Sequence, residues 1–246
     1  MKKLILLLLV LCSVQSLSAQ KKLRLGNSSE YIISLARTTT NMGPSVNPVP
    51  RFSMWFNTGV VVEQKITNHF ALVSGLNLRN VGLINKLDSI KLKQRVYSTG
   101  VPLAIRFGDL NKKVNVTLGA EAEFFLNYKV KEFVFDEKIY KSNEWLSDNV
   151  ELFNPSVFAQ FQFGNSLYIR FKYYLNNFLK ECANQTGTVN TCGYTMHNSA
   201  KTTISGYPLN TQLFYMSFGT ERFDKNKKKK PNNTSPTPTR TPTRSI

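Results

Sequence analysis

The sequence predicts an all-β protein: an eight-stranded antiparallel transmembrane β-barrel with short turns at one end, long loops at the other and a disordered basic C-terminal tail. Three observations predict this fold. Apolar and polar residues alternate with a period of two through most of the chain between residues 30 and 221, as they do in β-strands. The alternating segments run for about 10 residues or more, close to the ~9–11 that a tilted membrane-spanning strand needs. The connections between them are alternately short and long, which is typical of membrane barrels.

Composition argues against two other classes of protein. The 246 residues include 12% aromatic and 19% charged residues, whereas a disordered chain is poor in aromatics. After the first twenty residues, no apolar run approaches the roughly 18 residues of a membrane-spanning helix. Two histidines and three cysteines are little material for a metal site, so we expect neither a metal nor a cofactor.

The first 19 residues have the pattern of a secretory signal peptide. Lys2 and Lys3 give a positive start, residues 4–11 form an apolar core, and residues 16–19 supply the small residues that precede cleavage. The core is too short to span a membrane. Cys12 follows a leucine, whereas a lipoprotein signal needs glycine or alanine there. We therefore expect cleavage after residue 19 and no lipid anchor.

Residues 225–246 differ in kind from the predicted barrel domain at 20–224. This tail has seven basic residues, no acidic residue and four prolines, so it cannot bury a core. It carries +7 of the net charge of +17. Basic clusters attract anionic surfaces through long-range fields, so the tail is a candidate binding site for a periplasmic or outer-membrane partner; nucleic acid is not expected for an exported protein. The candidate residues are Lys227, Lys228, Lys229 and Lys230.

Eight segments are predicted as strands. The first, at 30–39, is the weakest. In the second, at 54–66, apolar residues from Met54 to Ile66 alternate with the face that carries Glu63 and Lys65. The other six follow the same pattern, each marked by a pair on its apolar face: 70–79 (Leu76, Leu78), 97–107 (Leu103, Ile105), 114–128 (Leu118, Phe124), 157–163 (Phe161, Phe163), 167–175 (Phe171, Tyr173) and 214–221 (Phe214, Phe218).

The charges on the polar faces favour a membrane barrel over a soluble sandwich or lipocalin-like fold. A soluble fold turns its apolar face inward, whereas a membrane barrel turns it outward around a polar interior. The mid-strand charges are nearly balanced, and an eight-stranded barrel is only wide enough for side chains to fill. We therefore expect an ion network that closes the lumen, built from Glu63, Lys65, Arg79, Arg106, Glu121, Glu123, Arg170, Lys172 and Glu221.

The connections predict the orientation in the membrane. Short turns of outer-membrane barrels face the periplasm, and an even number of strands places both termini there. The predicted location is the outer membrane of a Gram-negative cell, in contact with outer-membrane lipid. The predicted short turns are 67–68, 108–113 and 164–166, and the predicted long loops are 40–53, 82–95, 129–154 and 176–209.

Two residue pairs are candidates for catalysis. His197 and Ser199 have the His-x-Ser spacing of lipid A deacylase barrels, in which a base activates a nucleophile. The asparagine expected after that serine is absent, so a solvated loop is the favoured interpretation. Glu121 and Glu123 share one strand face and could act as an acid–base pair. The arginines expected in the same lumen favour structural ion pairing.

Two cysteines remain after signal removal, Cys182 and Cys192, both in the last predicted long loop. An exported protein meets an oxidising environment, so we expect a disulfide rather than a metal or catalytic site. His69 borders a short turn and is predicted to be a turn or interfacial residue.

Several stretches resemble the small outer-membrane barrels of Bacteroidota, the broad family that includes PorT-like proteins. They are SLSAQ at the signal end, TGVVVEQKITNHFALVSGLNLRNVG, VPLAIRF, VTLGAEAEFFLNYK and the closing LFYMSFGTERF. The resemblance covers residues 25–223, and the chain departs from it by continuing for 23 residues after Phe223. Asp88-Ser89-Ile90 also resembles an O-glycosylation acceptor of these bacteria, which makes Ser89 a modification candidate.

The resemblance implies a non-enzymatic barrel that serves as a structural or accessory subunit of an envelope secretion or assembly machine, such as type IX secretion. Protein partners would bind through the tail or the loops. Two alternatives stay open at this stage. One is a lipid A-modifying enzyme, and the other is a narrow channel or small-ligand receptor.

Overall fold

The computed structural model describes residues 23–40, 46–87, 90–110, 114–164, 166–180, 194–197, 203–207 and 209–223. Within these ranges every regular element is a β-strand and every strand pairing is antiparallel, which confirms the predicted all-β class. The strands are β1 (Leu23–Thr40), β2 (Val46–Val49), β3 (Arg51–Ser53), β4 (Thr58–Lys65), β5 (Phe70–Leu87), β6 (Ile90–Gly108), β7 (Val114–Val134), β8 (Glu137–Trp145), β9 (Phe153–Phe163), β10 (Leu167–Tyr174), β11 (Tyr194–His197), β12 (Thr203–Tyr207) and β13 (Leu209–Phe223).

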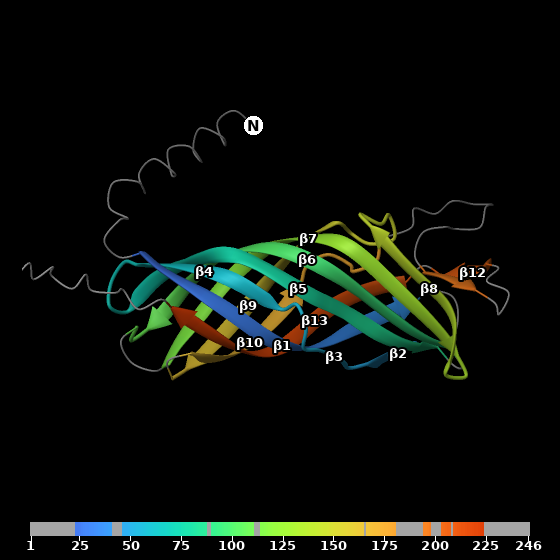
Figure 1. The fold of residues 1–246 in the computed structure, drawn as a ribbon, viewed down its shortest axis with the longest axis horizontal. Helices are drawn as coiled ribbons and strands as arrows, with labels where there is room; N and C mark the ends of the chain where they lie inside the picture. The colour runs from blue at the N-terminus through green and yellow to red at the C-terminus, as the bar shows by residue number, and fades with distance from the viewer. Residues whose placement is uncertain are drawn as a thin grey trace, which may run out of the picture.

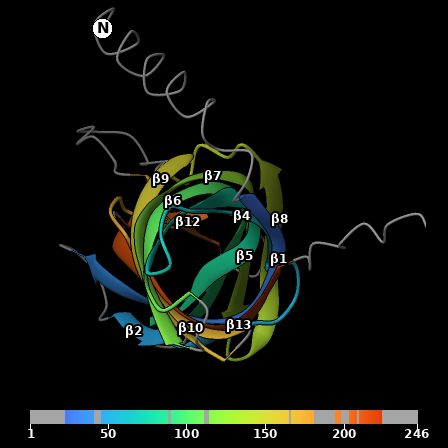
Figure 2. The ribbon, with the colours of Figure 1, turned by 90° about the vertical axis from the view of Figure 1, so that its left-hand side faces the viewer.

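Eight of the described strands form a closed circuit. The order is β1, β4, β5, β6, β7, β9, β10 and β13, and β13 pairs back with β1. This closing ladder runs from Gly26 opposite Phe223 to Thr40 opposite Leu209. Figure 2 looks along the long axis and shows the strands arranged as a ring. We call this closed sheet the barrel.

The two ends of the barrel differ (Figure 1). One end holds the short connections β4–β5, β6–β7 and β9–β10, the start of β1 and the end of β13. At the other end β5 pairs with β6 and β7 pairs with β8 as long hairpins, while β2 lies against β5 and β3 against β1. We call the two parts of the barrel the turn-side half and the loop-side half.

Each of the four predicted long loops contains strands. β2 and β3 lie within 40–53, β11 and β12 lie within 176–209, and the other two loops are largely strand. Residues 82–87 belong to β5 and residues 90–95 to β6, and much of 129–154 lies in β7 and β8. The period of two continues through these residues, but the polar and apolar faces change places. In β6, Leu92 is buried inside the barrel while Lys93 and Arg95 point outward. The outward face of these strand segments carries lysine and arginine instead of apolar residues. Their composition is therefore that expected of a solvated loop.

Two details of strand boundary and register also differ from the prediction. β4 begins at Thr58 rather than at residue 54, because Phe56 has a φ of 64°, outside the extended region. The β6–β7 ladder shifts between Tyr97 and Ser98, which is a β-bulge. The shift turns Tyr128, predicted on the apolar face, into the interior, where it is 4% exposed.

The two halves of the barrel have opposite arrangements of side chains. On the outer surface of the turn-side half, large apolar side chains are exposed on all eight strands. We call them the apolar belt. Its members include Leu23, Leu25, Tyr31, Val60, Leu76, Leu78, Val101, Leu103, Ile105, Phe107, Val114, Leu118, Phe124, Phe153, Val157, Phe161, Phe163, Leu167, Phe171, Tyr173, Phe214 and Phe218.

Candidate functional site

Charged side chains fill the interior of the turn-side half. They come from seven of the eight strands of the barrel, and all but Arg24 are almost fully buried. Five carboxylates meet five cations, so the group is balanced in charge. We call it the lumen ion network. Its members are Arg24, Glu30, Glu63, Arg79, Arg106, Glu121, Glu123, Arg170, Lys172 and Glu221.

Arg79 of β5 holds the centre of the network. Its Nε donates to Glu30 Oε1 at 2.5 Å, and its Nη1 donates to Glu121 Oε1 at 2.5 Å and to Glu123 Oε1 at 3.3 Å. The planar guanidinium suits this role because it presents donors in several directions at once. One cation thereby joins strands β1 and β7 across the interior.

Lys172 of β10 is the second cation on the β7 carboxylates. Its Nζ lies 2.7 Å from Glu121 Oε2 and also pairs with Glu123. Tyr174 donates its hydroxyl to Glu123 Oε2 at 2.9 Å. Glu121 and Glu123 are therefore paired with two cations, and the geometry is that of structural ion pairs.

A second centre lies nearer the short turns. Arg106 donates from Nη1 to Glu63 Oε2 and from Nη2 to Glu221 Oε1, both at 2.6 Å. Arg24 donates to the other oxygen of Glu63 at 2.9 Å. Gln160 donates to Glu221 Oε2 at 3.2 Å, so all four oxygens of these two carboxylates are occupied.

Glu30 joins the closing strands to the network. Its Oε2 accepts from Ser217 at 2.7 Å and from Arg170 at 3.4 Å. Arg170 also donates twice to Gln160 Oε1, at 3.0 and 2.7 Å. A buried charge is tolerated when it is paired and hydrogen-bonded, and these contacts meet that condition for Glu30.

The sequence prediction and the structure differ at three members. Arg24 was missed because the first strand was expected to begin at residue 30, and Glu30 was missed because this weakest strand had no inward face assigned to it. Continuing its alternation back to Leu23 would have placed both on the inward face. Lys65 was included in the prediction, but none of the ion pairs between described residues contains it.

An apolar cluster fills the interior of the loop-side half. Phe125 is 1% exposed and lies with its ring 5.6 Å from Phe178 and 6.0 Å from Tyr174. The alternation along the strands did not predict this cluster. We call it the lumen apolar core, which consists of Ile32, Ala36, Val81, Leu83, Leu92, Val96, Phe125, Tyr128, Val130, Val150, Tyr174, Phe178, Leu179, Leu213 and Tyr215.

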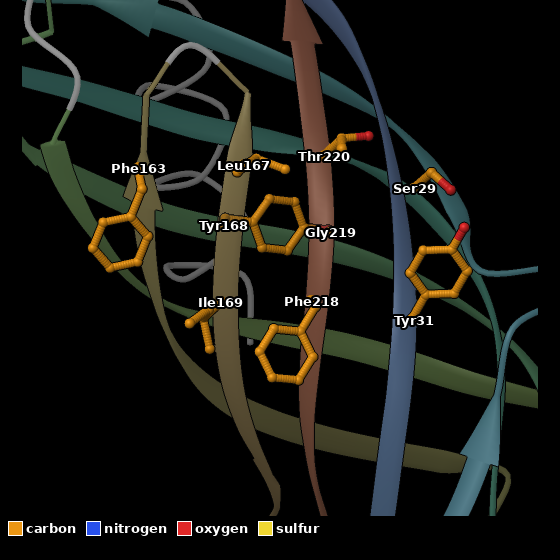
Figure 3. A pocket seen from close by; sticks show the side chains of 9 residues that line it. All are labelled: Ser29, Tyr31, Phe163, Leu167, Tyr168, Ile169, Phe218, Gly219 and Thr220. Atoms are coloured by element: carbon orange, nitrogen blue, oxygen red, sulfur yellow. The ribbon is translucent and has the colours of Figure 1, made fainter.

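A shallow groove of about 450 Å³ lies where β9, β10, β13 and β1 adjoin near the short turns (Figure 3). Phe163, Leu167, Phe218 and Tyr31 supply apolar walls, and the small Ser29 lies next to Tyr31 on β1, at the edge of the groove. The groove belongs to the same outer surface as the apolar belt. Its lining suits a hydrocarbon chain better than a polar ligand.

The other predicted sites fall mostly outside the described residues. Ser89, Cys182, Cys192, Ser199, the four tail lysines Lys227–Lys230 and the signal peptide are not among them, and of His197 only the backbone, at the end of β11, is described. His69 lies in the β4–β5 turn, where its carbonyl accepts from Gly108 N at 3.0 Å and its N–H donates to Thr67 Oγ1.

The described residues contain neither a metal-binding cluster nor a membrane-spanning helix. No group of three or more His, Cys, Asp or Glu side chains in that part of the chain is placed to hold a metal ion. No helix there is both long and apolar enough to cross a membrane.

Comparison with known proteins gives structural neighbours only. No model of a known protein family matches the chain, and no curated protein matches it in sequence. Solved structures that match include Ail, the attachment invasion locus protein of Yersinia pestis (TM-score 0.31, 11% identity, 80% of this chain and 98% of that one). Neisserial surface protein A matches with a TM-score of 0.38 and 13% identity over 80% of this chain and 96% of that one. The outer membrane protein OprG from Pseudomonas aeruginosa matches with a TM-score of 0.37 and 7% identity over 81% and 95%. Structural likeness of this degree assigns no function to the chain.

Proposed function

We propose that the protein is an eight-stranded β-barrel of the Gram-negative outer membrane, with a closed lumen, that serves as a non-enzymatic structural or accessory component of the envelope. The apolar belt is the observation that carries this proposal. An exposed apolar surface around a whole barrel, over an interior of paired charges, is the reverse of a water-soluble protein. Outer-membrane lipid would cover it.

The height of the belt matches a bilayer. Along the outer face of β6, apolar residues begin at Phe107 and give way to Tyr97, ten positions away. At ~3.4 Å per residue this is about 34 Å of strand, and a tilt of about 40° reduces it to about 26 Å along the barrel axis. The apolar band of outer-membrane barrels is about 25 Å tall.

Aromatic side chains mark the loop-side border of the belt. Tyr97 contacts Phe56 edge-on with ring centroids 5.7 Å apart. Trp55 and Trp145 are 74% and 71% exposed, and Asn127 of β7 pairs with Tyr97 of β6 on one side and with Trp145 of β8 on the other. Exposed Trp and Tyr are enriched where a membrane meets water. We call these four aromatics the interfacial girdle.

The orientation follows from the two ends of the barrel. Short turns of outer-membrane barrels face the periplasm, so the start of β1 and the end of β13 would lie there too. The β5–β6 and β7–β8 hairpins would then project outside the cell. A basic tail after β13 would meet periplasmic partners, in keeping with an accessory role in a secretion or assembly machine.

The filled interior favours a role other than transport. The lumen ion network occupies one half and the lumen apolar core occupies the other. An eight-stranded barrel filled in this way has no water path of channel size. We therefore expect the full-length protein to show no conductance steps in planar bilayers.

The decisive experiment combines location with partner capture. Outer membranes are washed with high salt and carbonate, and the protein is tested for retention and for heat-dependent mobility on gels. Loss to the wash without a mobility shift would overturn the membrane proposal. The full-length protein and a form ending at Asp224 are then purified in mild detergent.

Capture of a stoichiometric partner by the full-length protein alone would assign the contact to the tail. A solitary barrel in both samples would contradict the accessory role. A change in lipid A mass on His197→Ala or Ser199→Ala would support the enzymatic alternative instead.

A further inference from the structure

Six cations gather on the outer surface of the barrel at the start of the loop-side half. They come from four strands, β3, β6, β7 and β8, and are half-buried or exposed. None of the ion pairs between described residues includes any of the six. We call them the cationic patch: Arg51, Lys93, Arg95, Lys129, Lys131 and Lys141.

Strand register brings these charges directly opposite one another. Arg95 faces Lys129 and Lys93 faces Lys131 across the β6–β7 ladder, and Lys131 faces Lys141 across β7–β8. Like charges directly opposite on neighbouring strands destabilise a sheet. Because three such pairs follow one another, binding of an anion here would be favourable, since its negative charge would offset the repulsion between the cations.

Several side chains of the patch are fixed in place. Arg51 donates from Nη2 to Asn80 Oδ1 at 2.7 Å and from Nη1 to the Asn80 carbonyl at 3.2 Å. Arg95 stacks over the Tyr97 ring at 5.2 Å, and Lys93 lies over the Phe133 ring at 4.8 Å. The cations are therefore held partly desolvated against the sheet rather than extended into water.

The patch encloses a hollow with an unused donor. The hollow has a volume of about 120 Å³ and is lined by five of the six cations together with Gln94. Arg95 Nε is buried and has no hydrogen-bond partner among the described residues. Burial and the nearby Arg95 lower the pKa of Arg51 to about 10. A phosphate oxygen in the hollow would satisfy the donor and offset the positive field.

The position of the patch along the barrel axis, just beyond the interfacial girdle, points to a membrane lipid as the source of the phosphate. On the outer face of β6, Leu103 and Val101 belong to the apolar belt, Tyr97 belongs to the interfacial girdle, and Arg95 comes next. The cations thus begin one outward position beyond the girdle, where lipid headgroups would lie. A lipid bound there would rest its chains on the belt and its phosphates on the patch.

We propose that the cationic patch binds the phosphate groups of a phosphorylated glycolipid of the outer leaflet, such as lipid A. This inference rests on the proposed outer-membrane location. The bound lipid would be part of the working protein and would hold the β6–β7–β8 sheet against its own repulsion.

The test uses the full mature chain in neutral detergent micelles, with lipid binding counted by native mass spectrometry. The probes are bisphosphorylated lipid A and dephosphorylated lipid A with the same acyl chains, with inorganic phosphate as competitor. We expect saturable binding of the phosphorylated lipid only. The variant Arg95→Gln/Lys129→Gln should bind it about 30-fold more weakly, at about 1 kcal/mol for each cation near an anionic lipid surface.

Two further variants keep the test specific. Lys180→Gln/Arg222→Gln removes the same charge from outside the patch and should bind as the parent does. Arg95→Lys/Lys129→Arg keeps both charges and should retain binding.

Equal binding of dephosphorylated lipid A would overturn the proposal. So would an equal loss in the Lys180→Gln/Arg222→Gln variant, because net charge would then explain the binding. Full competition by inorganic phosphate at the lipid's own concentration would show a free-phosphate site and overturn the assignment to lipid. Retention in washed outer membranes would be unaffected by any of these results, so failure here is distinguishable from failure of the proposed function.

Discussion

The turn-side and loop-side halves of the barrel share the long strands β5, β6 and β7, yet their outer faces differ in polarity. In the turn-side half, Leu103 and Ile105 of β6 face outward and Arg106 faces inward to two glutamates. In the loop-side half of the same strand, Lys93 faces outward and Leu92 lies in the lumen apolar core. The backbone alternation is continuous between them.

This reversal shows that the alternation of side chains along a strand and the polarity of each face are separate properties. A period of two states only that neighbouring side chains face opposite ways. Which face is apolar depends on the medium that each face meets. In the proposed outer-membrane location, a strand whose outer face changes from apolar to basic at the interfacial girdle would pass there from lipid to water.

The largest effect is expected from removing the central cation of the turn-side half. Arg79→Met leaves Glu30, Glu121 and Glu123 short of a buried partner, and breaking a buried ion network costs about 3–5 kcal/mol. The free energy of unfolding would be measured by urea titration in lipid vesicles. Arg222→Met, on the exposed outer face, should change it by less than about 0.5 kcal/mol. A loss below about 1 kcal/mol in Arg79→Met would mean that the network contributes little.

A loss of similar or slightly smaller size is expected in the loop-side half. Phe125→Ala removes a ring from the centre of the lumen apolar core, and such truncations cost about 3 kcal/mol or more in well-packed interiors. The same titration measures it, with Phe125→Leu as the milder companion. An unchanged stability would show that water fills this half of the lumen.

The third prediction distinguishes lipid from water outside the turn-side half. Leu103 is 69% exposed, so Leu103→Arg would be nearly neutral on a water-facing surface. Near the middle of a bilayer the same change costs about 2–4 kcal/mol, falling to about 0–1 near the border. Thr99→Arg, on the same face but at the border, is the matched control. Equal small effects in both variants would contradict the membrane assignment.

The smallest effect is expected on the outer face of the loop-side half. Without lipid, Lys129→Gln should raise the free energy of unfolding by about 0.2–1 kcal/mol, because it removes the like charge opposite Arg95. The gain should shrink in 1 M salt, where the screening length is about 3 Å. A loss of stability at low salt would mean that the pair is not repulsive.

The sequence predicts the turn-side half better than the loop-side half for a physical reason. In the turn-side half, belt residues such as Phe161 and Phe171 mark one face so strongly that strand and face are both evident. In the loop-side half many of the outward residues, such as Lys93, Lys129 and Lys131, are lysines, so the segments at 82–95 and 129–154 were expected to be loops.

Most members of the lumen ion network were predicted because charges at mid-strand have no other place in a membrane barrel. The partners could not be assigned, since Arg79 reaches Glu30 and Glu121 across the interior rather than along one ladder. Tyr128 points inward because of a single β-bulge, which no residue pattern in the sequence predicts. The cationic patch likewise depends on register, which sets lysines from separate strands opposite one another.

The ladder between β1 and β13 also governs how the chain reaches this structure. It pairs residues from the two extremes of the described chain, Gly26 with Phe223 and Thr40 with Leu209. Contacts of such long sequence separation form slowly, because the loop-closure entropy is lost before they stabilise the chain. Until they form, β1 and β13 are open edges able to pair with other chains. Assembly therefore remains open to pairing with other chains until its last step, and after that step each strand of the eight-strand circuit has a partner on both sides.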